Sequence, residues 1–218
     1  MKAGQQKESR VLFLKVLEID ERVVQAQYYA GLLALQLDDA RDAALHLERA
    51  VQLGLRQGGV YYLLATAQTQ WGDFEKAKEN QILAIQADPR MATAYHDLGI
   101  LYFRTQEYEK AIGAFKKALE IPPLSPKTFL MLGMTYVRLG KTENALEYVT
   151  LLRGANDELK ATHLESIIRA VSEKMNVPPL PDENLVPQTS SAVQAPGGRA
   201  SKPFSPPAKK ASQSTSYT

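Results

Sequence analysis

Apolar residues recur along most of the chain at the spacing of amphipathic helices. Tyr95, Leu98 and Tyr102 are separated by intervals that place their side chains on one face of a helix. A second apolar stripe, which includes Ala111 and Phe115, follows after a short polar stretch. The pattern predicts two helices that pack against each other along their apolar stripes.

The same pattern returns every 34 residues. Alanine stands at positions 43, 77, 111 and 145, and glycine or alanine stands at positions 31, 65, 99 and 133. Small residues at fixed places let two helix backbones approach closely. Between the helices, Gly72 and Gly140 suit the left-handed backbone that ends a helix. The sequence therefore predicts a series of helix pairs.

This pattern resembles the tetratricopeptide repeat, in which an aromatic residue, Leu-Gly and Tyr mark the first helix, and Ala, Phe, Ala and a closing Pro mark the second. Residues 92–125 match it almost completely, and residues 58–91 and 126–159 match most of it. Within residues 58–91, Gln81 stands where the pattern has an aromatic residue. The resemblance implies an all-α fold, a right-handed superhelical solenoid of helix-turn-helix repeats.

The repeat divides the chain into consecutive segments. They are an orphan second helix of a partial repeat (1–23), four repeats (24–57, 58–91, 92–125 and 126–159), a C-terminal capping helix (156–176) that overlaps the fourth repeat, and a disordered Pro/Ser-rich tail (177–218). Eight of the 12 prolines follow Asn176, and such a tail buries too little apolar surface to offset the entropy of ordering it. The orphan helix leaves three interpretations open: the chain is a fragment, the helix is a cap, or another chain supplies its partner.

The resemblance also implies a binding surface, because the first helices of such repeats line the concave inner face. Positions five, nine and twelve of each repeat point into that groove, and their spacing of four and three puts each trio on one helix face. The trios are Tyr28, Leu32 and Leu35; Tyr62, Thr66 and Thr69; His96, Ile100 and Phe103; and Leu130, Met134 and Val137. Arg104 and Arg138 follow two of the trios and are candidates to hold an acidic flank of a ligand.

Most of these positions are apolar, and a contiguous exposed apolar patch marks an interaction surface. We therefore expect a protein partner that inserts an amphipathic helix or an extended apolar peptide. The competing interpretation is that the inner face packs on itself or is filled by the capping helix. Some relatives hold a C-terminal carboxylate with cationic and amide side chains; that clamp is missing here, since Leu63 and Asp97 are among the residues at the matching positions. Self-association through the repeat ends is also expected, because the orphan helix presents Leu12 and Phe13 with no preceding helix.

Composition narrows the chemistry. The 26 Lys and Arg residues nearly balance the 24 Asp and Glu residues, so we expect no specific nucleic-acid binding. Cysteine is absent, which excludes disulfides and Cys-ligated metals, and His46, His96 and His163 lack a metal-binding spacing. We expect no catalytic residue, no metal and no cofactor. His46 is expected to face solvent, His163 to be half-buried, and Trp71 to pack at the turn between two helices. The capping helix is expected to pack through the face that carries Leu159, His163, Ile167, Ala170 and Val171.

The sequence thus predicts a non-enzymatic interaction scaffold or adaptor that holds a partner segment in an apolar groove. The alternative is a fragment, or a regulatory or targeting module, of a larger repeat protein or enzyme. The sequence contains no signal peptide and no transmembrane segment as written, so a cytoplasmic location is the default expectation.

Overall fold

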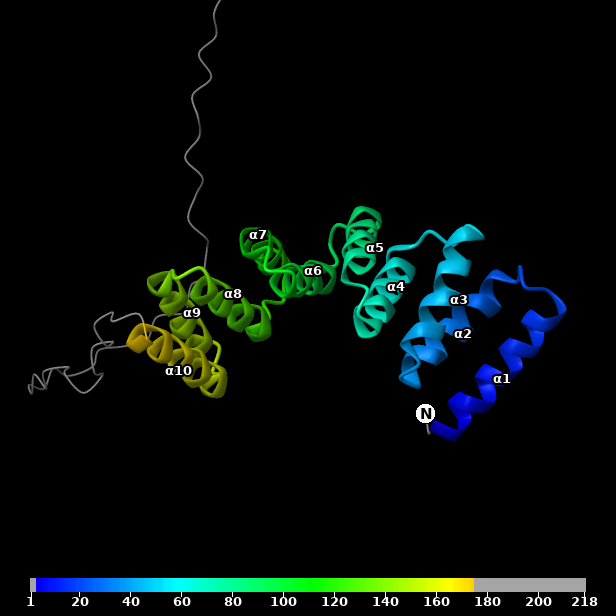
Figure 1. Cartoon of the computed structure of the whole chain (residues 1–218), viewed down its shortest axis with the longest axis horizontal. Coiled ribbons are helices and arrows are strands. Elements are labelled where there is room, and N and C mark those ends of the chain that lie inside the picture. The colour runs from blue at the N-terminus through cyan, green and yellow to red at the C-terminus, as the bar shows by residue number, and fades with distance from the viewer. Residues whose placement is uncertain (1–2, 175–218) are drawn as a thin grey trace, which may run out of the picture. The chain divides into compact units, whose positions relative to one another are not determined.

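A computed structural model describes residues 3–174, and within this range the chain folds into helices without any strand. The helices are α1 (Ala3–Ile19), α2 (Val24–Gln36), α3 (Ala40–Gln52), α4 (Gly58–Trp71), α5 (Phe74–Ala87), α6 (Ala92–Arg104), α7 (Tyr108–Leu119), α8 (Pro126–Arg138), α9 (Thr142–Gly154) and α10 (Glu158–Lys174) (Figure 1). The predicted disordered tail, residues 177–218, lies outside the described residues.

Each helix packs mainly against the helices next to it in the sequence. The four pairs α2–α3, α4–α5, α6–α7 and α8–α9 make the most extensive contacts, and the second helix of each pair packs against the first helix of the next. At the ends of the described chain, α1 packs against α2, and α10 packs against both α9 and α8. This arrangement is an all-α solenoid of helix pairs, which confirms the predicted fold class.

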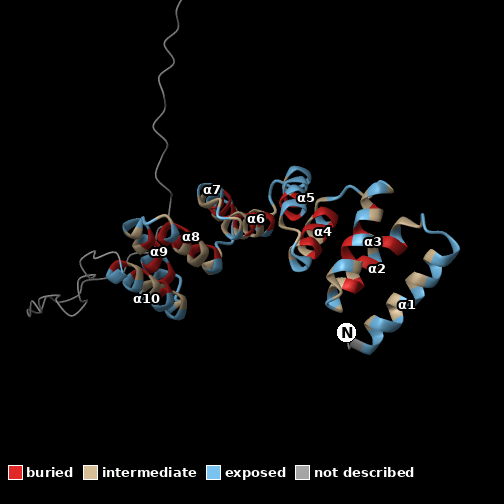
Figure 2. Ribbon diagram, viewed as in Figure 1, coloured by how far each residue is buried: buried red, intermediate tan, exposed pale blue. Residues whose placement is uncertain are grey.

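The small-residue columns lie where the paired helices touch. The alanines at positions 43, 77, 111 and 145 are completely buried. Figure 2 shows the buried residues gathered where neighbouring helices meet. The 34-residue alanine column is therefore a packing column, because a larger side chain has no room between the helices.

The glycine column marks still closer approaches. A Cβ atom added to Gly99 would lie 2.5 Å from Cε1 of Phe115, and one added to Gly133 would lie 2.4 Å from Cδ2 of Leu164. In the pair α4–α5 the residue that corresponds to Gly99 is Ala65, and Gln81 stands at the repeat position of Phe115 in place of an aromatic ring. Gln81 is buried, and its Nε2 donates a hydrogen bond to the carbonyl of Ala94 at 3.1 Å.

The turn within each pair has a left-handed residue at the same repeat position. Gly72 and Gly140 have φ angles of 93° and 71°, as the sequence predicted. Asp38 and Gln106 occupy the equivalent positions with φ angles of 66° and 64°. The repeat geometry therefore imposes this backbone even where the residue is not glycine.

Helix α1 covers part of α2 and is tied to the start of α3. The ring of Phe13 stacks on Tyr29 with 5.1 Å between centroids, and Arg10 forms ion pairs with Asp39 and Asp42. The opposite face of α1 exposes Val11, Leu12, Val16 and Ile19. Leu12 is thus uncovered, as the sequence predicted, whereas Phe13 is partly covered by α2.

Helix α10 is buried along one side against α8 and α9. Ala161, Leu164 and Ile168 are completely buried. The prediction that Leu159 and His163 lie on the packed face is wrong, since Leu159 is 83% exposed and His163 is exposed. The helix is rotated so that positions 161, 164 and 168 face the repeats, which turns positions 159 and 163 outward.

A polar network joins the second and third helix pairs. Nζ of the buried Lys78 on α5 lies 2.6 Å from Oε1 of Glu107 and 2.9 Å from Oε1 of Glu75. Glu107 also accepts hydrogen bonds from Nζ of Lys110 at 2.6 Å and from Oγ1 of Thr105 at 2.8 Å. The bonds from Lys110, Lys78 and Thr105, in that order, lower the pKa of Glu107 to about 2.

None of the described helices combines the length and the apolar composition that a bilayer crossing requires.

Candidate binding groove

The candidate groove residues lie on α2, α4, α6 and α8, the first helices of the four pairs. Their apolar side chains are half-buried rather than exposed, apart from Val137, which is buried. Arg104 and Arg138 are exposed. The hollows among these side chains form two separate pockets. Polar residue types predominate in the lining of one, called the polar hollow, and apolar residue types in the lining of the other, called the apolar hollow.

The polar hollow lies between α4 and α6 and is called the α4–α6 pocket below. Its volume is about 220 Å³, and its walls are Thr66, Thr69, Gln70, Gln81, Asp97, Ile100 and Arg104. Four of these residues, Thr66, Thr69, Ile100 and Arg104, are candidate groove residues. The structure therefore brings together groove positions from two successive repeats.

Asp97 is the acidic group of the α4–α6 pocket, and the sequence analysis did not include it among the candidate site residues. The hydroxyl of Tyr62 donates a hydrogen bond to Oδ2 of Asp97 at 2.9 Å. Burial raises the pKa of Asp97, and burial together with the Asp97 charge raises the pKa of Tyr62 to about 12. The sequence did contain a signal for Asp97. At the same position of the preceding and following repeats stand the apolar Leu63 and Met131, so a carboxylate is exceptional there.

The apolar hollow lies between α8 and α10 and is called the α8–α10 pocket below. Its volume is about 630 Å³, and its walls are Met134, Val137, Arg138, Leu139, Gly140, Ile167 and Val171. Met134, Val137 and Arg138 are candidate groove residues, whereas Ile167 and Val171 come from the capping helix. The sequence predicted this helix as a cap and left open that it fills the inner face; in the structure its Ile167 and Val171 line the pocket.

The remaining candidate residues line neither pocket; they are Tyr28, Leu32, Leu35, Tyr62, His96, Phe103 and Leu130. Several of them take part in packing instead. Tyr28 lies edge-on to Tyr29 with 5.1 Å between ring centroids, and Phe103 lies edge-on to Tyr108 at 5.6 Å. The inner face is thus partly packed on itself, with space for a ligand at the two pockets.

Two of the three histidines are used as hydrogen-bonding links between helices. Nδ1 of His96 lies 2.8 Å from Oγ1 of Thr128, and Nδ1 of His46 lies 2.7 Å from Oε1 of Gln27. Burial lowers the pKa of both histidines. The prediction that His46 faces solvent is wrong, because its bond to Gln27 turns it toward α2. Residues 3–174 contain no group of three or more His, Asp or Glu side chains arranged to hold a metal ion.

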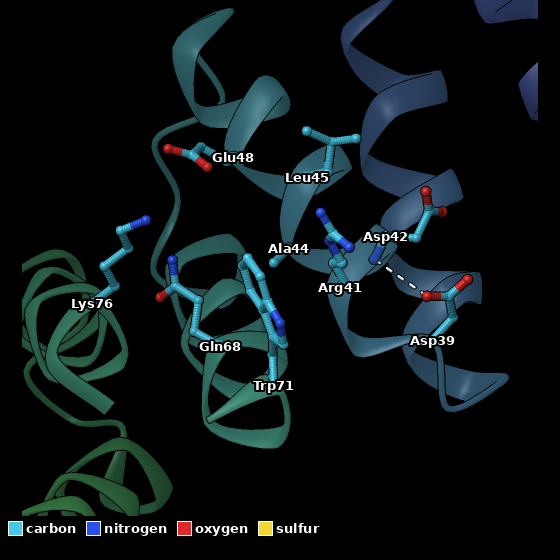
Figure 3. A pocket seen from close by; sticks show the side chains of 9 residues that line it. All are labelled: Asp39, Arg41, Asp42, Ala44, Leu45, Glu48, Gln68, Trp71 and Lys76. Atoms are coloured by element: carbon cyan, nitrogen blue, oxygen red, sulfur yellow. Dashed lines mark hydrogen bonds between the residues drawn. The ribbon is translucent and has the colours of Figure 1, made fainter. Parts of the chain in front are cut away.

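A third hollow lies apart from the groove positions, between α3 and the turn that joins α4 to α5 (Figure 3). Its volume is about 590 Å³, and the figure shows Trp71 facing Leu45 and Arg41 across it. The guanidinium carbon of Arg41 lies 5.8 Å from the Trp71 ring centroid. Trp71 is 50% exposed, so the prediction that it packs at the turn is only partly correct.

Comparison with known proteins identifies the repeat. Two sequence profiles of the tetratricopeptide repeat match the chain. One matches residues 92–123, and the other matches residues 58–91 and 126–151. "TPR repeat-containing protein MJ1428" of Methanocaldococcus jannaschii is 31% identical in an alignment 140 positions long that covers 61% of this chain and 23% of that protein. "Protein CTR9 homolog" of Arabidopsis thaliana is 26% identical in an alignment 192 positions long that covers 68% of this chain and 18% of that protein. The chain therefore spans less than a quarter of the length of these relatives.

Solved structures share the fold. A crystal structure of MamA protein superposes with a TM-score of 0.66 at 24% identity, covering 82% of this chain and 90% of that one. YrrB, described as a TPR protein with an unusual peptide-binding site, superposes with a TM-score of 0.69 at 21% identity, covering 75% of this chain and 84% of that one.

The matched repeats and the shared solenoid place the chain in the tetratricopeptide repeat family. Members of this family are generally non-enzymatic modules that bind other proteins. The chain thus contains repeats of a kind that generally serve as protein-interaction modules.

Proposed function

We propose that the chain binds a peptide segment of a partner protein across its first helices, with an apolar side chain of the partner in the α8–α10 pocket. The observation that carries the proposal is this pocket, whose walls include Met134, Leu139 and Val171 and are mostly apolar. Burying apolar surface there is favourable by about 25 cal/mol per Å². An anchor of this kind, seated near the centre of an interface, supplies much of the binding energy in peptide complexes.

The repeat register supports one continuous binding surface. Met134 and Val137 in the α8–α10 pocket occupy the same repeat positions as Ile100 on α6 and as Thr66 and Thr69 on α4. A segment that crosses the first helices therefore meets both pockets from the same side of the repeats. The description of YrrB as a peptide-binding TPR protein supports this use of the fold.

The test is a display selection of random 12-residue peptides on the full chain, followed by titration of the selected peptides against variants. Met134→Gln places an amide in the apolar pocket and is expected to weaken binding about tenfold or more. Leu151→Gln is the matched control, because Leu151 is an exposed apolar residue of α9 that lines neither pocket. Helical circular dichroism of each variant verifies that it is folded.

Equal affinity for the parent and the Met134→Gln variant would overturn the proposal. So would peptides whose binding is lost instead in Trp71→Ala, because the site would then be the third hollow. Phe103 and Leu130 are less suitable test positions, because they line neither pocket. Met134 also packs against the hydrophobic core, so the fold of its variant must be verified before binding is compared.

A second proposal is that the repeats serve as the regulatory or targeting module of a longer protein. Its support is the length of the curated relatives, of which the chain spans 23% and 18%. Sequencing the native transcript tests it: an open reading frame that continues with a further domain would favour this proposal, and one limited to the present residues would overturn it.

A further inference from the structure

The α4–α6 pocket contains a carboxylate without a counter-ion. Within the described part of the chain, Asp97 receives a hydrogen bond from the neutral Tyr62 hydroxyl, and no lysine or arginine forms an ion pair with it. Glu107 in the same repeat behaves differently, because two lysines form ion pairs with it. Asp97 therefore has an unused capacity to bind a cation.

The two threonine hydroxyls of the pocket have already used their donors. Oγ1 of Thr66 donates to the Tyr62 carbonyl at 2.9 Å, and Oγ1 of Thr69 donates to the Ala65 carbonyl at 2.7 Å. Both hydroxyl oxygens retain only acceptor capacity. Gln81 in the pocket wall uses one of its two Nε2 hydrogens on a backbone carbonyl, and its Oε1 is a further acceptor. The pocket thus offers oxygen acceptors, which match a group rich in N–H donors.

The dimensions suit a single side chain. The volume of about 220 Å³ is below the range of about 300–1,000 Å³ that is usual for small-molecule sites. Ile100 supplies an apolar wall for the methylene stem of a long side chain, in the way that lysine and arginine stems lie along apolar surface. Arg104 is the one cation in the pocket wall; it is exposed and lies over the Phe74 ring at 5.5 Å.

We propose that the α4–α6 pocket receives the side chain of a lysine or arginine from the bound peptide, with Asp97 as its counter-ion. This inference rests on the proposed function and defines its partner more closely, as a segment with a basic residue and an apolar residue that enter different pockets. Asp97 has no acidic equivalent at positions 29, 63 and 131 of the other repeats. The basic residue therefore also fixes the register of the peptide along the solenoid.

The test is a double-mutant cycle on a peptide obtained from the selection described above. Its lysine is replaced by norleucine, which keeps the aliphatic stem and removes the charge, and Asp97 is replaced by Asn. The lysine peptide is expected to lose about tenfold or more in affinity for Asp97→Asn, because a hydrogen-bonded charge pair is broken. The norleucine peptide is expected to bind both proteins equally. Tyr62→Phe, which keeps the carboxylate and removes its hydrogen bond, is expected to preserve the preference for lysine.

Three results would overturn the inference: selected peptides without enrichment of Lys or Arg, equal losses for the lysine and norleucine peptides, or selected acidic peptides whose binding is abolished by Arg104→Gln. In the last case the pocket would bind an anion through Arg104. These results are distinct from failure of the proposed function, which is read from the Met134→Gln variant. Glu109→Gln, which removes an exposed carboxylate of α7 outside the pocket, controls for a general effect of charge.

Discussion

Gly99 lies at a point of very close contact between α6 and α7, where its missing side chain leaves room for the ring of Phe115. Gly99→Ala is expected to destabilise the protein by about 1–3 kcal/mol, because the new methyl group overlaps the ring and forces a shift. The measurement is urea unfolding of the full chain followed by helical circular dichroism.

Gly113→Ala provides the control within the same helix pair. A Cβ atom at Gly113 meets nothing within 4 Å, so alanine there adds helix propensity of up to about 1 kcal/mol without a clash. If the two variants had the same stability, the ring of Phe115 would not be what requires glycine at position 99.

Glu107 makes part of the free energy of unfolding dependent on pH. Its pKa is lowered to about 2 in the folded chain, against 4.5 for an unperturbed glutamate. The stabilisation is therefore fully present above about pH 4.5 and is lost as the pH falls toward 2. Glu107→Gln is expected to lower the melting temperature at pH 7, and the difference from the parent is expected to shrink below pH 4.5. Glu109→Gln, at an exposed position in the first turn of α7, is expected to change little at either pH. A difference for Glu107→Gln that stays constant with pH would contradict the assignment.

At the scale of the helix, α10 is held by a buried leucine. Leu164 is completely buried and lies against the backbone position of Gly133 on α8. Leu164→Ala is expected to cost about 2–5 kcal/mol, because it leaves a cavity between α8, α9 and α10. Leu159→Ala, on the exposed side of the same helix, is expected to stay within about 0.5 kcal/mol of the parent. Chemical unfolding compares the two, and similar losses would mean that the burial pattern of α10 is misassigned.

The helices themselves could be predicted from the sequence because each repeat constrains backbone packing in the same way. The buried alanine at position 111 recurs at 34-residue intervals, and this regularity locates every helix pair without knowledge of the side chains around it. The capping helix has no such column. Its packed face was therefore predicted to include Leu159, whereas Ala161, Leu164 and Ile168 are the residues that are buried.

The groove was less predictable because it depends on whether each side chain packs against its neighbours or lines an open pocket. The repeat position of Phe103 is equivalent to that of Val137, yet Phe103 packs on Tyr108 while Val137 lines a pocket. The pocket near Asp97 depends on Gln81, whose amide stands where the repeat has an aromatic ring. Such differences arise from contacts between neighbouring repeats, which a 34-residue pattern does not report.

At the scale of the whole solenoid, complete repeats should be removable. Deleting residues 92–125 joins α5 to α8 in the register that α5 has with α6, since the deleted segment is 34 residues long. It also places Lys141 where Glu107 faced Lys78, so the deletion should be combined with Lys141→Glu. The shortened chain is expected to keep its helix content per residue and to unfold in one transition at a lower temperature.

Deleting residues 108–124 is the matched control, because it removes α7 alone and brings two first helices together. That variant is expected to lose helix content and to aggregate. Circular dichroism and light scattering distinguish the two deletions, and equal behaviour would show that the 34-residue register does not govern the assembly of the pairs.

The contact pattern, in which each helix meets mainly its neighbours in sequence, has a consequence for synthesis of the chain. At about 5–20 residues per second, a 34-residue unit leaves the ribosome in roughly 2–7 s, whereas helices form within about a microsecond. Each pair therefore has its partners present soon after it emerges and need not wait for distant segments. The solenoid can grow from its N-terminal end during translation, with each completed pair serving as the surface on which the next one condenses.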